Sequence, residues 1–210
     1  MKDLRLSRRQ VLKGAGAVGV LGALGIPTEV FADSGNDGGG RIRWDLIEFS
    51  PPDVRAGGND TASAEDESTL TLTGTGTFRP GHSRQVTGGG VWSTTNSVYV
   101  PRAGTYRVTE FVSWIQAPGT LVGTPLIDHI GDGTKTDTRA GLAVLRIKYS
   151  PDGLDGILFL SCNLPGAPAS VDEGINASRG FVNFFHPKMP TSGLASNRTL
   201  FHVLGEGDED

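Results

Sequence analysis

Hydrophobic and polar positions alternate strictly along residues 69–78 of the 210-residue chain. Threonine occupies the odd positions, and the even positions hold Leu70, Leu72, Gly74, Gly76 and Phe78. A period of two is typical of a β-strand with one buried face and one polar face. Residues 105–115 repeat the pattern, which places Tyr106, Val108, Val112 and Trp114 on one face. Both segments are therefore predicted to be strands.

Shorter apolar runs predict further strands over residues 42–49, 141–149, 156–164, 179–186 and 198–204. The run Ser150-Pro151-Asp152-Gly153 is a favourable turn sequence between two of them. Residues 56–68 are polar and predict a long loop, and residues 117–139 predict a loop or a short helix at most. About six to eight short strands without an amphipathic helix predict an all-β domain, either a small antiparallel barrel or a β-sandwich. Periodicity alone does not distinguish the two.

The first 32 residues differ from the rest of the chain. A basic segment comes first, followed by an apolar run over residues 14–26. The segment Val30-Phe31-Ala32 then ends in a small residue, as a cleavage site does. This order is typical of an export signal. The apolar run is shorter than the roughly 20 residues that cross a bilayer as a helix, so we do not expect it to remain as an anchor.

The segment Ser7-Arg8-Arg9-Gln10-Val11-Leu12-Lys13 resembles the twin-arginine export motif, with Val11 where that family usually has Phe. The resemblance implies passage of the folded protein through the twin-arginine translocase, followed by cleavage by signal peptidase. We expect cleavage after Ala32 and a final location in the periplasm or outside the cell. The alternative is an amphipathic or buried N-terminal helix, but the apolar run has no polar face.

These patterns divide the chain into a signal peptide (1–32), a flexible leader (33–41), one β domain (42–204) and an acidic tail (205–210). The signal holds five basic and two acidic residues, so its removal changes the formal net charge from −4 to −7. Such an acidic chain is a poor candidate for binding nucleic acid through bulk charge. Its single cysteine, Cys162, cannot form an intramolecular disulfide and alternates with leucines, which predicts a core position.

Several stretches of the β domain resemble a group of uncharacterised exported proteins of bacteria and fungi. They read "GTGTFRPG", "VTGGGVW", "AGLAVLRIKYS" and "SCNLPGAPASVDEGINASRGFVNFF". The glycine-rich strand pairs are also similar to those of the barrel shared by dirigent proteins and allene oxide cyclase. That second resemblance implies an antiparallel barrel and suggests a homo-oligomer, and it transfers no catalytic residues to this chain.

Glu110 is the first candidate for chemistry. Strand alternation places its carboxylate on the face of Tyr106 and Trp114, among apolar groups. If that face lines a cavity, loss of solvation would raise the pKa of Glu110 and make it a candidate acid or base. The alternatives are a β-bulge that returns Glu110 to solvent and a salt bridge to Arg107 or Arg146.

We expect ligand contacts from Tyr106, Trp114, Asn183 and His186, which lie on predicted strands. His129 stands between acidic residues, but the histidines lack the H-x-H or H-x-x-x-H spacing of a strong metal site, so none is predicted. The sequence indicates no particular cofactor.

Three functions fit these observations. The first is an exported β-barrel that binds a small apolar or amphipathic ligand, and the second is an isomerase or cyclase with Glu110 as its acid or base. The third is a non-catalytic envelope or surface protein that acts through its outer faces. A ligand binder should have a cavity, whereas a protein of the third kind should have a filled core and an exposed apolar patch.

Overall fold

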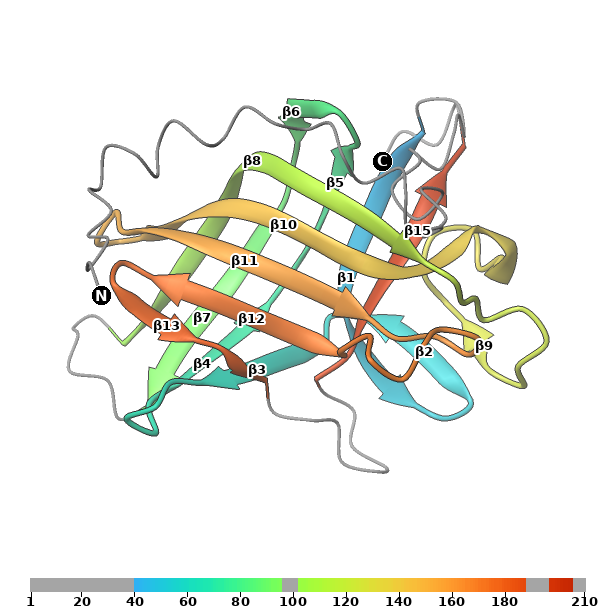
Figure 1. Ribbon diagram of the computed structural model, residues 1–210, viewed down its shortest axis with the longest axis horizontal. Helices are drawn as coiled ribbons and strands as arrows, with labels where there is room; N and C mark the ends of the chain where they lie inside the picture. Colours follow the sequence, from blue (N-terminus) through green and yellow to red (C-terminus); the bar gives the residue numbers. More distant parts are fainter. Residues whose placement is uncertain (1–39, 96–101, 188–196, 206–210) are drawn as a thin grey trace, which may run out of the picture. The chain divides into compact units, whose positions relative to one another are not determined.

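The computed structural model describes residues 40–95, 102–187 and 197–205 (Figure 1). The signal residues Arg8, Arg9 and Ala32, the leader up to residue 39 and residues 206–210 of the acidic tail lie outside these ranges. No helix in the described ranges is long and apolar enough to cross a membrane.

The described residues form fifteen strands and one short 3₁₀ helix, η2 (Lys135–Asp137). The strands are β1 (Arg41–Ser50), β2 (Asp53–Ala56), β3 (Asn59–Ser63), β4 (Thr69–Thr73), β5 (Thr75–Arg79), β6 (His82–Val86), β7 (Gly89–Thr95), β8 (Ala103–Ala117), β9 (Ile127–Asp128), β10 (Thr138–Ser150), β11 (Asp155–Cys162), β12 (Gly174–Arg179), β13 (Val182–Phe184), β14 (His186–Pro187) and β15 (Thr199–Leu204).

Six of these strands close into an antiparallel barrel. β1 pairs with β15 and β5, β5 pairs with β7, β7 pairs with β8, β8 pairs with β10, and β10 returns to β15. Closure satisfies the backbone hydrogen-bonding groups that the edges of an open sheet would expose. The predicted all-β barrel is confirmed, and the chain does not adopt the sandwich.

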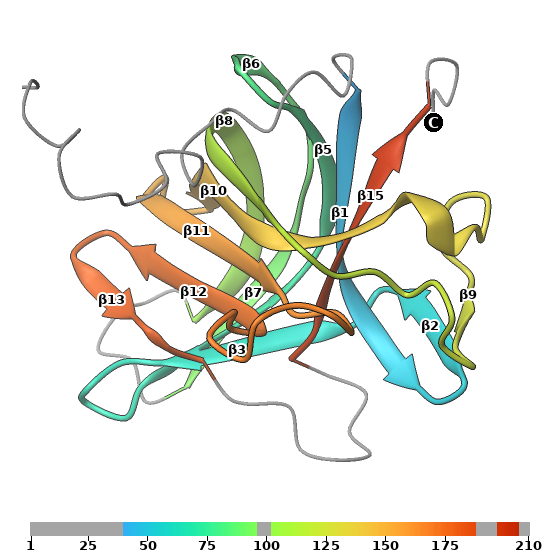
Figure 2. The same cartoon turned by 45° about the vertical axis from the view of Figure 1, so that its right-hand side comes forward.

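Further strands extend the barrel wall on two sides. β11, β12 and β13 continue from β10, whereas β4, β3 and β14 continue from β7. Figures 1 and 2 show β10, β11 and β12 running side by side, with β13 next to β12. The predicted turn joins β10 to β11. There Gly153 has a φ of 74° and donates its backbone N–H to the carbonyl oxygen of Tyr149 at 3.0 Å.

Aromatic side chains fill the interior of the barrel. Trp44, Phe78 and Phe201 are completely buried, and Phe111 is nearly so. The ring of Phe78 stacks on Phe111 with centroids 5.0 Å apart and meets the ring of Phe201 at 6.4 Å. Side chains are expected to fill a barrel of so few strands. The interior described by these residues is therefore a packed core.

Three expectations about the elements are wrong. Residues 179–186 are not one strand, because a turn at Gly180 and Phe181 separates β12 from β13. Residues 56–68 are not one loop, because β3 pairs with β4 and buries Asp60 and Ala62 at alternate positions. The alternating run of residues 69–78 is divided at Gly74 into β4 and β5; both pair with β7, but β4 also pairs with β3, whereas β5 pairs with β1. A Cβ at Gly74 would lie 2.3 Å from the Tyr106 hydroxyl oxygen, so glycine permits this close approach.

Candidate functional site

Two β-bulges in β8 decide where Glu110 points. The register between β8 and β10 shifts on either side of the pairs Leu145↔Phe111 and Arg146↔Glu110. A bulge inserts one residue and so reverses the alternation of the strand beyond it. Phe111 is consequently buried in the barrel, whereas Glu110 lies on the outward face opposite Arg146.

The structure therefore corrects the expected environment of Glu110. Its carboxylate pairs with the Arg146 guanidinium at 3.1 Å, and its side chain is 45% exposed. It does not share a buried face with Tyr106 and Trp114, and Val112 is exposed as well. A bulge and a salt bridge to Arg146 were the stated alternatives, and both are present. The isomerase or cyclase hypothesis thereby loses the buried acid or base on which it depended.

Tyr106 and Trp114 both lie on the buried side of β8 but in different surroundings. The Tyr106 hydroxyl donates to the carbonyl oxygen of Thr73 at 3.0 Å, and burial raises the pKa of this phenol well above its ordinary value. The Trp114 ring contacts Phe201, with centroids 4.6 Å apart. Packing within the core accounts for both aromatic side chains.

Asn183 and His186 lie elsewhere in the domain. Asn183 is an exposed residue of β13, and His186 is an exposed residue of β14 that pairs with Ser63. Neither strand pairs with β8. The structure thus does not assemble the four expected ligand residues around one cavity, and their role as a set remains a prediction.

Cys162 is completely buried at the end of β11, as its alternation predicted. Burial and the nearby Glu173 carboxylate raise the pKa of its thiol well above the ordinary value. The thiol is thereby held in its protonated, weakly nucleophilic form. A nucleophilic role for Cys162 does not fit this environment.

A buried histidine of β15 pairs with a carboxylate of β9. His202 Nε2 lies 2.8 Å from Asp128 Oδ2, and both side chains are almost fully buried. Asp128 also accepts the backbone N–H of Ile130 at 2.9 Å. The pair ties residues 128–130 to the barrel. Within the part of the chain that the structure describes, no group of three or more His, Cys, Asp or Glu residues is arranged to hold a metal ion.

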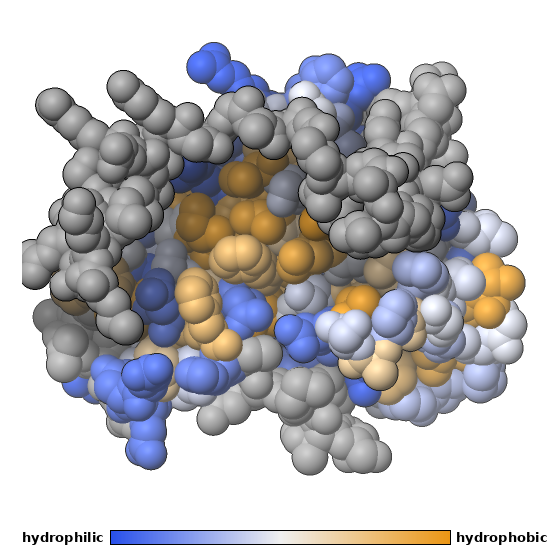
Figure 3. Space-filling view, viewed as in Figure 1, coloured by the Kyte–Doolittle hydropathy of each residue, from blue (hydrophilic) through white to orange (hydrophobic). Residues whose placement is uncertain are grey.

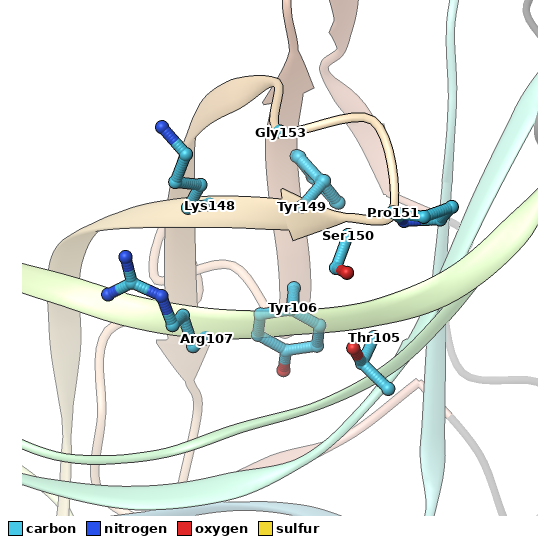
Figure 4. A pocket seen from close by; sticks show the side chains of 8 residues that line it. All are labelled: Thr105, Tyr106, Arg107, Lys148, Tyr149, Ser150, Pro151 and Gly153. Carbon is cyan, nitrogen blue, oxygen red and sulfur yellow. The ribbon is translucent and has the colours of Figure 1, made fainter.

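The candidate binding site is a pocket of about 400 Å³ where β8 meets the end of β10 (Figure 4). It is lined by Thr105, Tyr106, Arg107, Lys148, Tyr149, Ser150, Pro151 and Gly153. Burial alternates along both strands, so the exposed side chains of Thr105, Arg107 and Ser150 and the half-exposed Lys148 stand on the outward face. Two hydroxyl groups and two cations therefore surround the pocket.

Buried groups beneath the pocket fix its walls. Trp92 Nε1 lies within hydrogen-bonding distance of two carbonyl oxygens, those of Thr105 at 3.0 Å and Ser150 at 3.1 Å. The buried Arg179 guanidinium lies 4.2 Å from the centroid of the Trp92 ring and forms an ion pair with Asp152 in the β10–β11 turn. Both ends of the pocket are thus tied to the core, so a ligand would enter a site that is already shaped.

An apolar surface continues along the same outward face, away from the pocket. We call it the outer apolar patch, and it comprises Val112, Ile115, Leu142, Val144, Ile157, Phe159 and Phe185. Register pairs join its members across strands, with Ile115 opposite Leu142 and Val144 opposite Phe159. Figure 3 shows apolar side chains gathered over β8, β10 and β11. Ile115 is 64% exposed. A contiguous surface patch of large apolar side chains, unlike a single exposed one, is typical of an interaction site.

Comparison with known proteins identifies the N-terminal segment. Residues 5–25 match the TAT (twin-arginine translocation) pathway signal sequence. The chain is therefore exported by the twin-arginine route to the periplasm or the extracellular space, and the translocase and signal peptidase handle it. No curated protein and no solved structure matches this chain, so the predicted resemblance to dirigent proteins has no support from a homologue. Fold and signal together define an exported antiparallel β-barrel protein.

Of the residues that line the pocket, the sequence predicts a ligand contact for Tyr106 alone. Arg107 and Lys148 were missed as a pair because they are 41 positions apart, and only the β8–β10 register makes them direct neighbours. The available signal was that each stands one position away from a buried tyrosine, which places both on the outward face.

Proposed function

We propose that this exported barrel protein binds a small amphipathic ligand on the outward face of β8 and β10. One observation carries the proposal: a polar pocket and the outer apolar patch lie on the same face of the same two strands. The ligand's polar group would occupy the pocket, and its apolar part would cover the patch. The filled barrel interior favours this outer site over the lumen.

The dimensions fit such a ligand. A pocket of about 400 Å³ lies within the range that small-molecule sites occupy. Strands rise about 3.3 Å per residue, so Lys148 at the pocket stands roughly 13 Å from Val144 and roughly 20 Å from Leu142. An extended alkyl chain of ten carbons is about 12 Å long, because each carbon–carbon bond advances it by about 1.3 Å, so it reaches from Lys148 to the level of Val144.

Affinity for the ligand would come mainly from covering exposed apolar side chains. Val112 and Ile115 are 47% and 64% exposed, and each buried CH₂ group contributes about 0.8 kcal/mol. The rigid pocket walls reduce the conformational entropy lost on binding. The Glu110–Arg146 ion pair lies on the same face, and a ligand chain would pass beside it.

Calorimetric titration of the exported, mature protein tests the proposal. The probes are decanoate, decyl sulfate, decanol and decyltrimethylammonium, each below its micelle concentration. We expect binding of at least one probe, and a loss of roughly tenfold in affinity in the double variant Val112→Thr/Val144→Thr, since two apolar contacts within reach of a ten-carbon chain are removed. Val91→Thr is the matched control, because Val91 is 53% exposed on β7 outside the patch.

Two outcomes would contradict the proposal. One is no binding of any probe, and the other is an equal loss of affinity in Val91→Thr. Mass measurement by light scattering, on the same samples, tests the patch as a contact between copies of this chain. If the wild type is an oligomer that Val112→Thr/Val144→Thr dissociates, and no probe binds, the patch serves self-association and the protein acts through its outer faces.

A further inference from the structure

We infer that the polar group of the ligand is an oxyanion, such as a carboxylate or a sulfate or phosphate ester, held between Arg107 and Lys148. The inference rests on the proposed function and adds the charge of the ligand.

Arg107 and Lys148 are directly opposite each other in the β8–β10 register. Figure 4 shows both side chains on the same side of the pocket. Like charges directly opposite on neighbouring strands are destabilising, so the pair costs free energy in the unliganded protein. An anion between them would convert this repulsion into two attractive contacts. The formal net charge of the mature chain is −7, so a cation pair does not simply follow from composition.

Two carboxylates near the pocket are engaged by other arginines, and a third, Asp155, pairs with Lys148 itself. Asp152 pairs with the buried Arg179, and Glu110 pairs with Arg146. Asp155 lies 3.5 Å from the Lys148 ammonium, but its side chain is 85% exposed, and an exposed pair of this kind is weak. No ion pair of Arg107 is formed with the carboxylates of residues 40–95, 102–187 and 197–205. The Arg107 guanidinium, and the Lys148 ammonium with only the exposed Asp155 as its ion-pair partner in these ranges, are therefore available to an anionic ligand.

The remaining groups suit the same kind of ligand. A guanidinium presents a planar set of donors that matches two oxygens of a carboxylate, sulfate or phosphate. Thr105 and Ser150 add hydroxyl donors on the same outward face. Because the Thr105 and Ser150 backbones are held by Trp92, these donors need little reorganisation to reach an anion.

The test compares probes and variants in one titration series on the exported, mature protein. We expect decanoate and decyl sulfate to bind more tightly than decanol, and decyltrimethylammonium to bind least. Arg107→Gln and Lys148→Gln should each weaken the anionic probes by roughly tenfold, the usual effect of losing one charge-assisted hydrogen bond, and leave decanol unchanged. Added salt should weaken the anionic probes alone.

Arg55→Gln is the matched control, because Arg55 is 51% exposed on β2 and does not line the pocket. Equal loss of anion affinity in Arg55→Gln and Arg107→Gln would overturn the inference and indicate a general effect of surface charge. Equal affinity for decanol and decanoate, unchanged in Arg107→Gln, would overturn it while leaving the proposed function intact. Absence of binding by every probe would overturn the proposed function itself.

Inorganic sulfate separates a free anion from an amphiphile as the source of the bound group. Much weaker binding of sulfate than of decyl sulfate, together with sensitivity of both to Arg107→Gln, supports an amphipathic anion. Equal affinity of sulfate and decyl sulfate would support the anion site but contradict the proposed role of the outer apolar patch.

Discussion

Single buried carboxylates give this domain a pH dependence that its composition does not reveal. Asp60 is completely buried, and loss of solvation raises the pKa of its carboxyl to about 7. Glu173 is also buried, and the same cause raises its pKa to about 8. Backbone N–H groups of Arg198 and Thr199 donate to these two carboxyls, respectively, at 2.8 Å. The two acids thus anchor the start of β15.

Asp60→Asn should make the free energy of unfolding less dependent on pH. A raised folded-state pKa means that the folded protein binds a proton that the unfolded chain has released, so stability falls as pH rises from about 4 to about 7. Asparagine resembles the protonated acid and cannot ionise. We expect the variant to be more stable than wild type near pH 8, by roughly 2 to 4 kcal/mol, and similar to it near pH 4.

Urea unfolding at several pH values measures this effect. Asp155→Asn is the control, because Asp155 is 85% exposed and should change stability little at any pH. A variant Asp60→Asn whose stability falls with pH as steeply as that of wild type would show that Asp60 does not carry the proton.

At the scale of elements, the β10–β11 turn depends on a buried ion pair. Arg179 at the end of β12 is 1% exposed, stacks over Trp92 and pairs with Asp152 in the turn. A buried cation requires a partner charge, because loss of hydration is expensive. The turn also carries Pro151 and Gly153 of the pocket. Its position therefore links core stability to the binding site.

Asp152→Ala should destabilise the protein by roughly 2 to 4 kcal/mol, because it leaves the Arg179 charge buried without this partner. Asp155→Ala, three positions away in sequence and exposed, should cost less than about 0.5 kcal/mol. Chemical unfolding of both variants checks the difference. Equal effects would mean that Arg179 is satisfied without Asp152, and that the turn is held by its backbone hydrogen bonds instead.

Sequence periodicity predicted which segments are strands far better than how they are paired. The runs at 42–49, 141–149 and 156–164 reappear as β1, β10 and β11, because their apolar residues have one buried face to satisfy. The two bulges of β8 are marked only by the polar pair Thr109-Glu110 and the apolar pair Phe111-Val112, which break the alternation without showing which residues are inserted. Glu110 was misplaced for that reason. Asp60 was missed because only tertiary pairing buries β3 within a polar stretch.

At the scale of the whole molecule, the architecture of the barrel suits export of a protein that is already folded. The chain carries a twin-arginine signal, and that route is expected to carry proteins that are already folded. A barrel closed by pairing β1 with β15 needs both ends of the described domain before it is complete. Its core contains no disulfide that would have to form after export, because Cys162 is the single cysteine. The domain can therefore complete its folding before export, without a later oxidation step.

Arg8→Lys/Arg9→Lys should block export while leaving the β domain able to fold. The substitutions keep the charge of the segment and the apolar run, so they test recognition of the paired guanidinium groups rather than general basicity. We expect the precursor to accumulate inside the cell, as measured by fractionation and intact mass, while Lys13→Arg is exported normally. In the wild type we expect the mature chain to begin at Asp33. Equal export of Arg8→Lys/Arg9→Lys and wild type would mean that another feature of the N-terminal segment selects the route.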